Sequence, residues 1–270
     1  MTIDKAEETV KSSPEEKTLF KELNNFFDCI YLITLKRSVD RHRLINDRLE
    51  GLDYEIFWGV DGESLNLSHL QDSNLYSADL AKKKSSSNSP LTRGEIGCAL
   101  SHRKIYEDIL SNNYEKALIL EDDLVVNEKA SSTISKALEE LPDNWELLYL
   151  GYLENADGIT LSKRVLITFL IPLVNLFKKN KYDPERLRRK FYRPYSENIE
   201  ISGKHSGSHA YGVSKEGAKK LLEFQTPVIQ ASDNAKGEMC IDGSLNAYRL
   251  KTQAFYQNRE LPTTINNRYQ

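Results

Sequence analysis

The sequence is short of cysteine, and the few cysteines it has are scattered. Three occur among 270 residues, at Cys29, Cys98 and Cys240, and none belongs to a C-x-x-C pair. This pattern argues against a disulfide framework or a structural zinc site and favours a reducing compartment. Long apolar runs are also lacking, because no stretch reaches the roughly 18–20 residues that span a bilayer. The polar, acidic residues 1–23 contain no signal-peptide core, so we expect a cytoplasmic protein, soluble or peripheral on a membrane.

Two familiar nucleotide-binding loops are missing as well. The chain contains neither G-x-x-x-x-G-K-[ST] nor G-x-G-x-x-G, so it does not read as a P-loop or dinucleotide-binding enzyme. With 37 basic and 40 acidic residues the net charge is −3, which gives no reason to expect a nucleic-acid partner. The charge is uneven, however, because residues 178–193 carry eight basic and two acidic side chains, a local charge of +6.

The apolar pattern predicts an α/β protein. Short apolar runs typical of buried strands alternate with amphipathic stretches typical of helices, which predicts a sheet with helices on both faces. The length of 270 residues suits one large domain. We expect strands at residues 29–35, 54–58, 116–120, 146–150 and 208–214, and helices at residues 38–50, 92–111, 129–141 and 215–224.

Two segments fall outside this pattern. Residues 1–27 are a charged, partly helical lead-in, which places the main domain at residues 28–270. Residues 65–90 show no clear periodicity, and their last part, residues 82–90, has the lysine- and serine-rich composition of a loop.

Three consecutive acids, Glu121, Asp122 and Asp123, follow a strand-like apolar run. In open α/β sheets, ligands gather beyond the carboxyl ends of the strands. Adjacent carboxylates repel one another unless water, a cation or basic partners intervene. A hard divalent ion such as Mn²⁺ or Mg²⁺ suits this arrangement. A solvated acidic turn is the alternative reading.

The segment that begins at Thr92 combines a helix start with unusual glycines. Thr92 and Glu95 have the spacing of a capping box. Gly94 and Gly97 each cost the helix about 1 kcal/mol relative to alanine, which indicates close backbone approach. Glu95 and His102 lie on one face, two turns apart. The alternative is a capped helix packed on the sheet, with His102 as a satisfied partner.

Asp242 is a single acid between an apolar pair and a glycine. It reads either as a general base or as the N-cap of a helix.

Together, these features resemble glycosyltransferase family 25, the lipooligosaccharide and collagen galactosyltransferase-like group. The most specific motifs are Gly94-Glu-Ile-Gly-Cys-Ala-Leu-Ser-His102 and Leu120-Glu-Asp-Asp123. Weaker blocks follow in family order over most of residues 28–266, at residues 30–38, 40–41, 60–62, 207–211, 217–218, 241–242 and 261–265. The resemblance implies a GT-A-like fold with a single Rossmann-like mixed sheet. It also implies a UDP-sugar donor, with galactose expected, and inverting transfer to a saccharide of lipooligosaccharide, lipopolysaccharide or a related glycan.

The resemblance also assigns roles to residues. Glu121, Asp122 and Asp123 match the Asp-x-Asp-type motif that holds Mn²⁺ or Mg²⁺ on the donor diphosphate, with Asp123 as the first expected ligand and Glu121 as the second. The base is expected at Asp242, with Asp233 as the fallback. Nucleotide-binding residues are expected at Thr34, Lys36, Arg41, Asp61, Gly62, Glu95, Ser101 and His102, and acceptor contacts at His209 and Tyr211.

One departure concerns the metal ligands. Many GT-A enzymes use a late histidine as a further metal ligand, but no histidine follows His209 here. A third protein ligand would therefore have to be another kind of residue.

Residues 164–195 join an apolar run to the basic block. Residues 165–177 are mostly apolar, interrupted by Pro172, and the +6 segment follows at once. Apolar surface beside Lys and Arg is typical of an interfacial anchor on an anionic leaflet. We therefore expect a protein peripheral on the inner face of the membrane, facing a lipid-linked saccharide acceptor. A buried element or a dimer contact is the alternative for this segment, and a non-catalytic glycan- or membrane-binding relative is the alternative for the whole chain.

Overall fold

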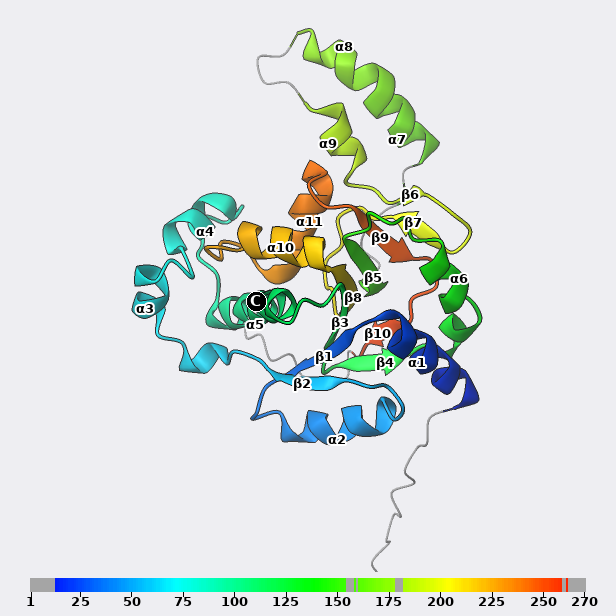
Figure 1. The fold of residues 1–270 in the computed structure, drawn as a ribbon. Coiled ribbons are helices and arrows are strands. Elements are labelled where there is room, and N and C mark those ends of the chain that lie inside the picture. The colour runs from blue at the N-terminus through cyan, green and yellow to red at the C-terminus, as the bar shows by residue number, and fades with distance from the viewer. Residues whose placement is uncertain (1–12, 154–157, 159, 178–181, 259–260, 262–270) are drawn as a thin grey trace, which may run out of the picture.

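The computed structural model of the protein describes residues 13–153, 158, 160–177, 182–258 and 261. Within them, eight strands form one mixed sheet through the middle of the molecule (Figure 1). β1 runs parallel to β2 and β3, whereas β8 is antiparallel to both β3 and β5. The spatial order is β2 (Glu55–Trp58), β1 (Cys29–Thr34), β3 (Lys116–Glu121), β8 (Ala210–Ser214), β5 (Leu147–Gly151), β9 (Ala247–Leu250), β7 (Ile199–Ile201) and β6 (Arg193–Pro194). A second, two-stranded sheet pairs β4 (Leu124–Val126) with β10 (Phe255–Gln257).

Helices cover both faces of the large sheet. Alternate residues of β3 point to opposite faces, so Leu118 and Leu120 join one buried cluster while Ala117 and Ile119 join another. The first cluster includes residues of α1 (Pro14–Phe26), α2 (Val39–Arg48) and α6 (Ile134–Glu139). The second includes residues of α5 (Arg93–Ser111), α10 (Lys215–Phe224) and α11 (Ser232–Asp242). The expected α/β fold, a mixed sheet with helices on both faces, is confirmed, and it is consistent with a GT-A-like protein.

The first described helix, α1, belongs to the core. It begins with a capping box in which Ser13 and Glu16 exchange hydrogen bonds. Leu19, Phe20 and Leu23 are fully buried, at the i, i+1, i+4 spacing of a helix face. The lead-in expected over residues 1–27 therefore contains a packed helix, while residues 1–12 lie outside the described part of the chain.

Two short helices occupy the stretch that lacks periodicity in the sequence. They are α3 (Leu67–Asp72) and α4 (Ala78–Lys84), each capped by a side-chain oxygen at its start. Leu70 and Ala81 pack against α5 in a third buried cluster. Helices of six and seven residues contain too few turns for a visible period. The loop predicted over residues 82–90 is wrong for residues 82–84, which belong to α4. The loop begins only after residue 84, where three lysines complement the carboxyl end of α4.

The helix expected over residues 129–141 is divided. A 3₁₀-helix, η2 (Glu128–Ser132), comes before α6. The hydroxyls of Ser131, Ser132 and Thr133 each donate to a backbone carbonyl three residues earlier. Such local hydrogen bonds compete with regular helix geometry and account for the break.

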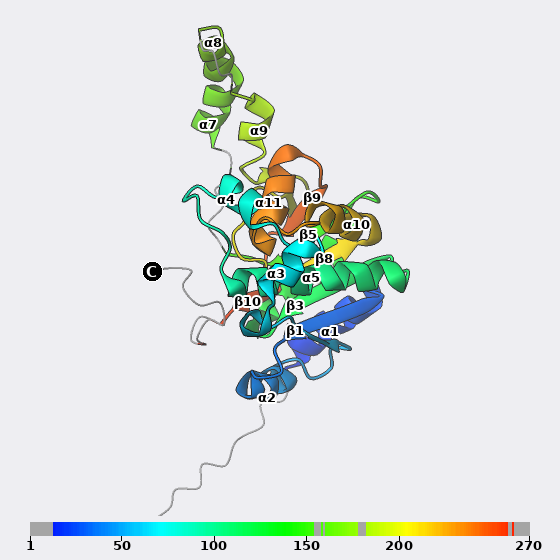
Figure 2. The same cartoon turned by 90° about the vertical axis from the view of Figure 1, so that its left-hand side faces the viewer.

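Residues 161–177 form an arm that projects from the body of the protein (Figures 1 and 2). α7 (Leu161–Val165), the π-helical turn η3 (Leu166–Leu170) and α8 (Ile171–Asn175) follow one another directly. The wide turn lies just before Pro172, which has no N–H to donate to the preceding turn. α9 (Pro184–Arg188) then leads back to the body. None of the described helices is both long enough and apolar enough to cross a membrane.

α5 approaches the loop after β2 so closely that only glycine fits. A Cβ on Gly97 would lie 2.6 Å from the Val60 carbonyl oxygen, and one on Gly62 would lie 2.5 Å from the Arg93 carbonyl oxygen. Ser101 Oγ accepts a hydrogen bond from the Val60 N–H at 2.8 Å and donates to the Gly97 carbonyl at 2.7 Å. The close approach expected from the helix glycines is confirmed at Gly97. It fixes the start of α5 beside the loop that follows β2.

This packing gives a prediction for Gly97→Ala. Alanine is the better helix former by about 1 kcal/mol, but its Cβ meets backbone atoms that cannot rotate away. We expect the free energy of unfolding to fall by about 1–3 kcal/mol, as in overpacked cores. Urea denaturation followed by circular dichroism measures it. Lys104→Ala, at an exposed position of the same helix, should stay within about 0.5 kcal/mol of the native chain. A higher unfolding midpoint for Gly97→Ala would contradict the contact.

Candidate functional site

A cavity of about 860 Å³ opens at the carboxyl ends of β1 and β3. α5, the residues just before β8 and the start of α11 complete its wall. It brings together many residues that the sequence singles out. These are Thr34, Arg41, Gly62, Ser101, His102, Glu121, Asp122, Asp123 and His209, with the fallback base Asp233.

The middle acid of the triplet is held by protein partners. Asp122 accepts a hydrogen bond from Thr34 Oγ1 at 2.6 Å and one from Arg41 Nη1 at 2.5 Å. Asp122 and Arg41 are both 9 % exposed, so the pair is a buried one. β1 and β3 are in register with Ile33 opposite Glu121, which sets Thr34 beside Asp122. Asp122 therefore anchors the turn to β1 and α2.

The acids of the triplet that could hold a cation are Glu121 and Asp123, which both line the cavity. Asp123 Oδ2 accepts a hydrogen bond from Gln257 Nε2 at 2.8 Å. Its other oxygen, Oδ1, is buried with no hydrogen-bond partner among the described residues. Burial, reinforced by the charge of Glu121, raises the pKa of the Asp123 carboxyl to about 7. Two carboxylates offer oxygen ligands that fit a hard divalent ion. Such an ion would reduce the repulsion between Glu121 and Asp123 and would give Asp123 Oδ1 a partner.

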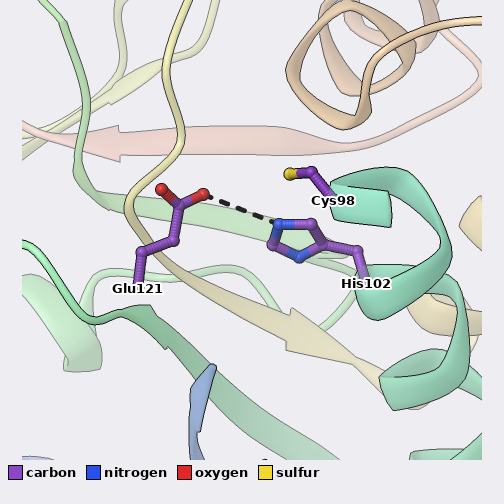
Figure 3. A group of neighbouring side chains, drawn as sticks. All are labelled: Cys98, His102 and Glu121. Atoms are coloured by element: carbon purple, nitrogen blue, oxygen red, sulfur yellow. Dashed lines mark ion pairs between the residues drawn. The ribbon is translucent and has the colours of Figure 1, made fainter. Parts of the chain in front are cut away.

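His102 is fixed by a chain of buried hydroxyls. Its Nδ1 is 2.8 Å from the Tyr211 hydroxyl, which is 2.8 Å from the Tyr106 hydroxyl. Its Nε2 lies 3.6 Å from Glu121 Oε1 (Figure 3). Burial, together with the nearby ammonium of Lys236, lowers the pKa of His102 well below its ordinary value. The imidazole is therefore neutral and oriented toward the acidic turn.

The first turns of α11 add an acid and a buried lysine. Asp233 lines the cavity, where its carboxylate accepts hydrogen bonds from the backbone N–H groups of Gly207 at 3.1 Å and Asn234 at 2.8 Å. Lys236 is fully buried, donates to Ser232 Oγ at 2.7 Å and lies 4.3 Å from the Tyr211 ring centroid. Burial lowers the pKa of Lys236 to about 8, and the charge of Asp233 opposes that shift.

Sequence reasoning missed Lys236, although the chain holds a signal for it. Lys236 lies three and four residues before Met239 and Cys240, and all three are buried in α11. A lysine on the apolar face of a helix is the pattern that could have found it. Gln257 and Asn258, which also line the cavity, have no such signal. Gln257 ends and Asn258 follows β10, a three-residue strand that only its pairing with β4 defines.

Four of the expected nucleotide or acceptor residues are not part of the cavity wall. Lys36 Nζ lies 5.8 Å from the Trp58 ring centroid, and Asp61 pairs with Arg37 Nε at 2.7 Å. Glu95 caps α5 through Thr92, which confirms the capping box. Tyr211 is fully buried behind His102.

Asp242 is also outside the cavity. It is the last residue of α11, followed by Gly243 with φ of 75°, so the reading of Asp242 as a helix N-cap is wrong. Its carboxylate pairs with Arg186, and its carbonyl accepts from Arg189 Nη1 at 3.1 Å. The cavity contains Asp233 instead.

Comparison with known proteins identifies the family. The family model described as "Glycosyltransferase family 25 (LPS biosynthesis protein)" matches residues 27–235. The chain belongs to glycosyltransferase family 25. The family match includes the acidic turn, the α5 motif and Asp233, and it ends before Asp242.

Named relatives in this family match only part of their own length. Procollagen galactosyltransferase 2 of Mus musculus is 36 % identical over 130 residues, which cover 46 % of this chain and 21 % of that protein. A glycosyltransferase 25 family member of Aedes aegypti is 30 % identical over 202 residues, covering 72 % of this chain and 28 % of that protein. A human relative named inactive glycosyltransferase 25 family member 3 is 29 % identical over 132 residues, with coverages of 46 % and 22 %.

Proposed function

We propose that this protein transfers galactose from UDP-galactose, with inversion, to a saccharide acceptor of lipooligosaccharide or related glycan assembly. The family supports glycosyl transfer from a nucleotide sugar, and its description refers to LPS biosynthesis. The name of the mouse relative, procollagen galactosyltransferase 2, supports galactose as the sugar. The observation that carries the proposal is the cavity, which holds Glu121 and Asp123 at the end of β3 together with Asp233 at the start of α11.

In this proposal, Glu121 and Asp123 hold Mn²⁺ or Mg²⁺ against the donor diphosphate. The ion would neutralise charge that develops on the departing UDP. Thr34 and Arg41 keep Asp122 out of this role and thereby position its neighbours. Ser101 and Gly62 border the same cavity from α5 and the loop after β2, where the nucleotide would lie.

Asp233 is our choice for the base. Inversion needs a group that takes the proton of the acceptor hydroxyl while its oxygen attacks the sugar carbon. The new bond forms on the face opposite the breaking bond to phosphate, and UDP leaves with that electron pair. Two backbone N–H groups hold the Asp233 carboxylate at the cavity wall. The Arg186 partner holds Asp242 away from it.

A non-catalytic role is the second candidate, because one human relative is named inactive. Such a protein would bind glycan or membrane without transferring sugar. Asp123, with a buried oxygen that lacks a partner in the described structure, favours the catalytic reading.

We also propose that the arm docks on an anionic membrane surface at the cytoplasmic face. Phe169 is 68 % exposed and Phe177 is 86 % exposed, whereas Ile167 is buried. The other exposed apolar side chains of the arm are Leu161, Val165, Leu166, Leu170, Leu173, Val174 and Leu176. Residues 160–177 contain Lys163 and Arg164 but no acid, and the +6 segment follows. This charge complements an anionic leaflet, where each cation adds roughly 1 kcal/mol.

Donor binding is the first test of the proposed function. At 100-fold the Kd, UDP with Mn²⁺ should stabilise the protein by about 2.7 kcal/mol and raise Tm by about 5–10 °C. Asp123→Asn should remove this gain, whereas the exposed Asp143→Asn should keep it. Differential scanning fluorimetry across UDP-sugars, with and without Mn²⁺, measures both. No shift with any nucleotide diphosphate would count against the proposal.

Sugar transfer separates the two candidate bases. Asp233→Asn should reduce transfer or donor hydrolysis by about 10²-fold or more, as loss of a general base does, and should keep the Tm gain with UDP and Mn²⁺. Asp242→Asn should change the rate by no more than a few-fold. The reverse pattern would assign the base to Asp242. Absence of transfer by the native chain with every donor, despite donor binding, would favour the non-catalytic candidate.

Vesicle flotation tests the arm. The native chain should float with phosphatidylglycerol vesicles and much less with phosphatidylcholine vesicles. Phe169→Ser/Phe177→Ser should weaken binding at least tenfold, because each buried phenylalanine contributes about 1.5–3 kcal/mol. Val39→Ser/Leu80→Ser removes two exposed apolar side chains of the body and should leave binding intact. Concentration-dependent dimerisation through the arm without vesicle binding would overturn the membrane proposal.

A further inference from the structure

Cys98, His102 and Glu121 converge at one point of the cavity wall (Figure 3). Each offers one ligand atom, and these atoms all lie within 4.8 Å of one another. Cys98 and His102 are four residues apart on α5, so they share one face of the helix, while Glu121 ends β3. The sulfur, the imidazole nitrogen and the carboxylate are thus brought together from two elements that pack in the core.

The distances suit direct coordination. His102 Nε2 and Glu121 Oε1 are 3.6 Å apart. Two such ligands on tetrahedral zinc, each at about 2.0–2.2 Å, would be about 3.4 Å apart. Small rotations of the side chains would therefore bring all three atoms within bonding distance of one ion.

The imidazole also has the support that metal-bound histidines usually have. Ligating histidines commonly donate their second ring N–H to a fixed acceptor, which sets the tautomer. Tyr211 takes this place, with its hydroxyl 2.8 Å from His102 Nδ1 and held in turn by Tyr106. With the proton on Nδ1, the lone pair of Nε2 points toward Glu121.

The ligand atoms of this site differ from the carboxylates proposed to hold the ion on the UDP-sugar. Thiolate and imidazole favour Zn²⁺ and similar borderline ions, whereas paired carboxylates favour Mg²⁺ and Mn²⁺. Three protein ligands facing a cavity leave an open fourth position. The nearby ammonium of Lys236 opposes a cation, but the combined negative charge of Glu121, Asp233 and a metal-bound thiolate exceeds it.

We propose that Cys98, His102 and Glu121 form a binding site for Zn²⁺ or another thiophilic divalent ion. Because Glu121 belongs to both sites and all three residues line the cavity, an ion held here competes with the donor and its own ion. The competition rests on the proposed function, whereas the metal site itself does not. Zn²⁺ would thus inhibit donor binding and sugar transfer.

Cobalt spectroscopy of the full chain tests the site directly. Co²⁺ should bind with a thiolate-to-metal charge-transfer band, which requires a sulfur ligand. Cys98→Ser and Cys98→Ala should each abolish the band, whereas Cys240→Ser, which alters a cysteine outside the cavity wall, should retain it. Zn²⁺ should bleach the band by displacing Co²⁺. A band that persists in both folded Cys98 variants, or no band at all in the native chain, would overturn the site.

Asp123→Asn separates this proposal from the proposed function. The charge-transfer band should survive in this variant, although the Tm gain from UDP and Mn²⁺ disappears. In the native chain, Zn²⁺ should reduce that gain, and in Cys98→Ser it should no longer do so. Loss of the cobalt band in Asp123→Asn would mean that Asp123 also holds the cobalt, and would overturn a site made by Cys98, His102 and Glu121 alone. If cobalt gives the band but UDP with Mn²⁺ gives no Tm gain in the native chain, the metal site is supported and the proposed function is contradicted.

Discussion

The buried contact of Asp122 with Arg41 and Thr34 decides what the acidic turn can do. Three adjacent carboxylates repel one another, and this contact neutralises the middle one through a guanidinium from α2 and a hydroxyl from β1. The turn is tied on its other flank as well, because Arg48 Nη1 donates to the Leu124 carbonyl at 2.9 Å. Asp122 is bound by protein partners, while Glu121 and Asp123, on either side of it, line the cavity. The proposal that Glu121 and Asp123 hold the cation therefore rests on a contact within the protein, that of Asp122 with Arg41 and Thr34.

Much of the fold could be predicted from the sequence because its strands are strongly apolar. The runs that became β1, β3 and β5 are almost wholly buried, and burial on both faces gives a continuous apolar signal. The sequence of α1 resembles a charged lead-in because its charged residues outnumber its three core residues. α3 and α4 leave no periodic signal because they are too short for a period to appear.

The sequence predicts those site residues that belong to one local motif. It predicts less well which of several similar residues lines the cavity, because tertiary contacts decide that. The acidic triplet and the α5 motif are local, and the cavity gathers both. Which acid is committed to a salt bridge depends on α2, which lies some eighty residues earlier. Asp233 and Asp242 are two acids of one helix, and the sequence does not reveal that Arg186 occupies the second. Lys236 lies between them, and its burial depends on the packing of α11 against Tyr211.

α11 connects two parts of the molecule that differ in character. Its first residues, Ser232 and Asp233, border the cavity, and its last, Asp242, is paired with Arg186 of α9 at the base of the arm. Glu238, one turn earlier, also pairs with Arg186, at 2.6 Å. A helix of 11 residues is about 16 Å long. If the arm docks on a membrane as proposed, α11 would keep the distance between α9 and the cavity fixed, and an acceptor would reach the cavity only if its own length matched that distance.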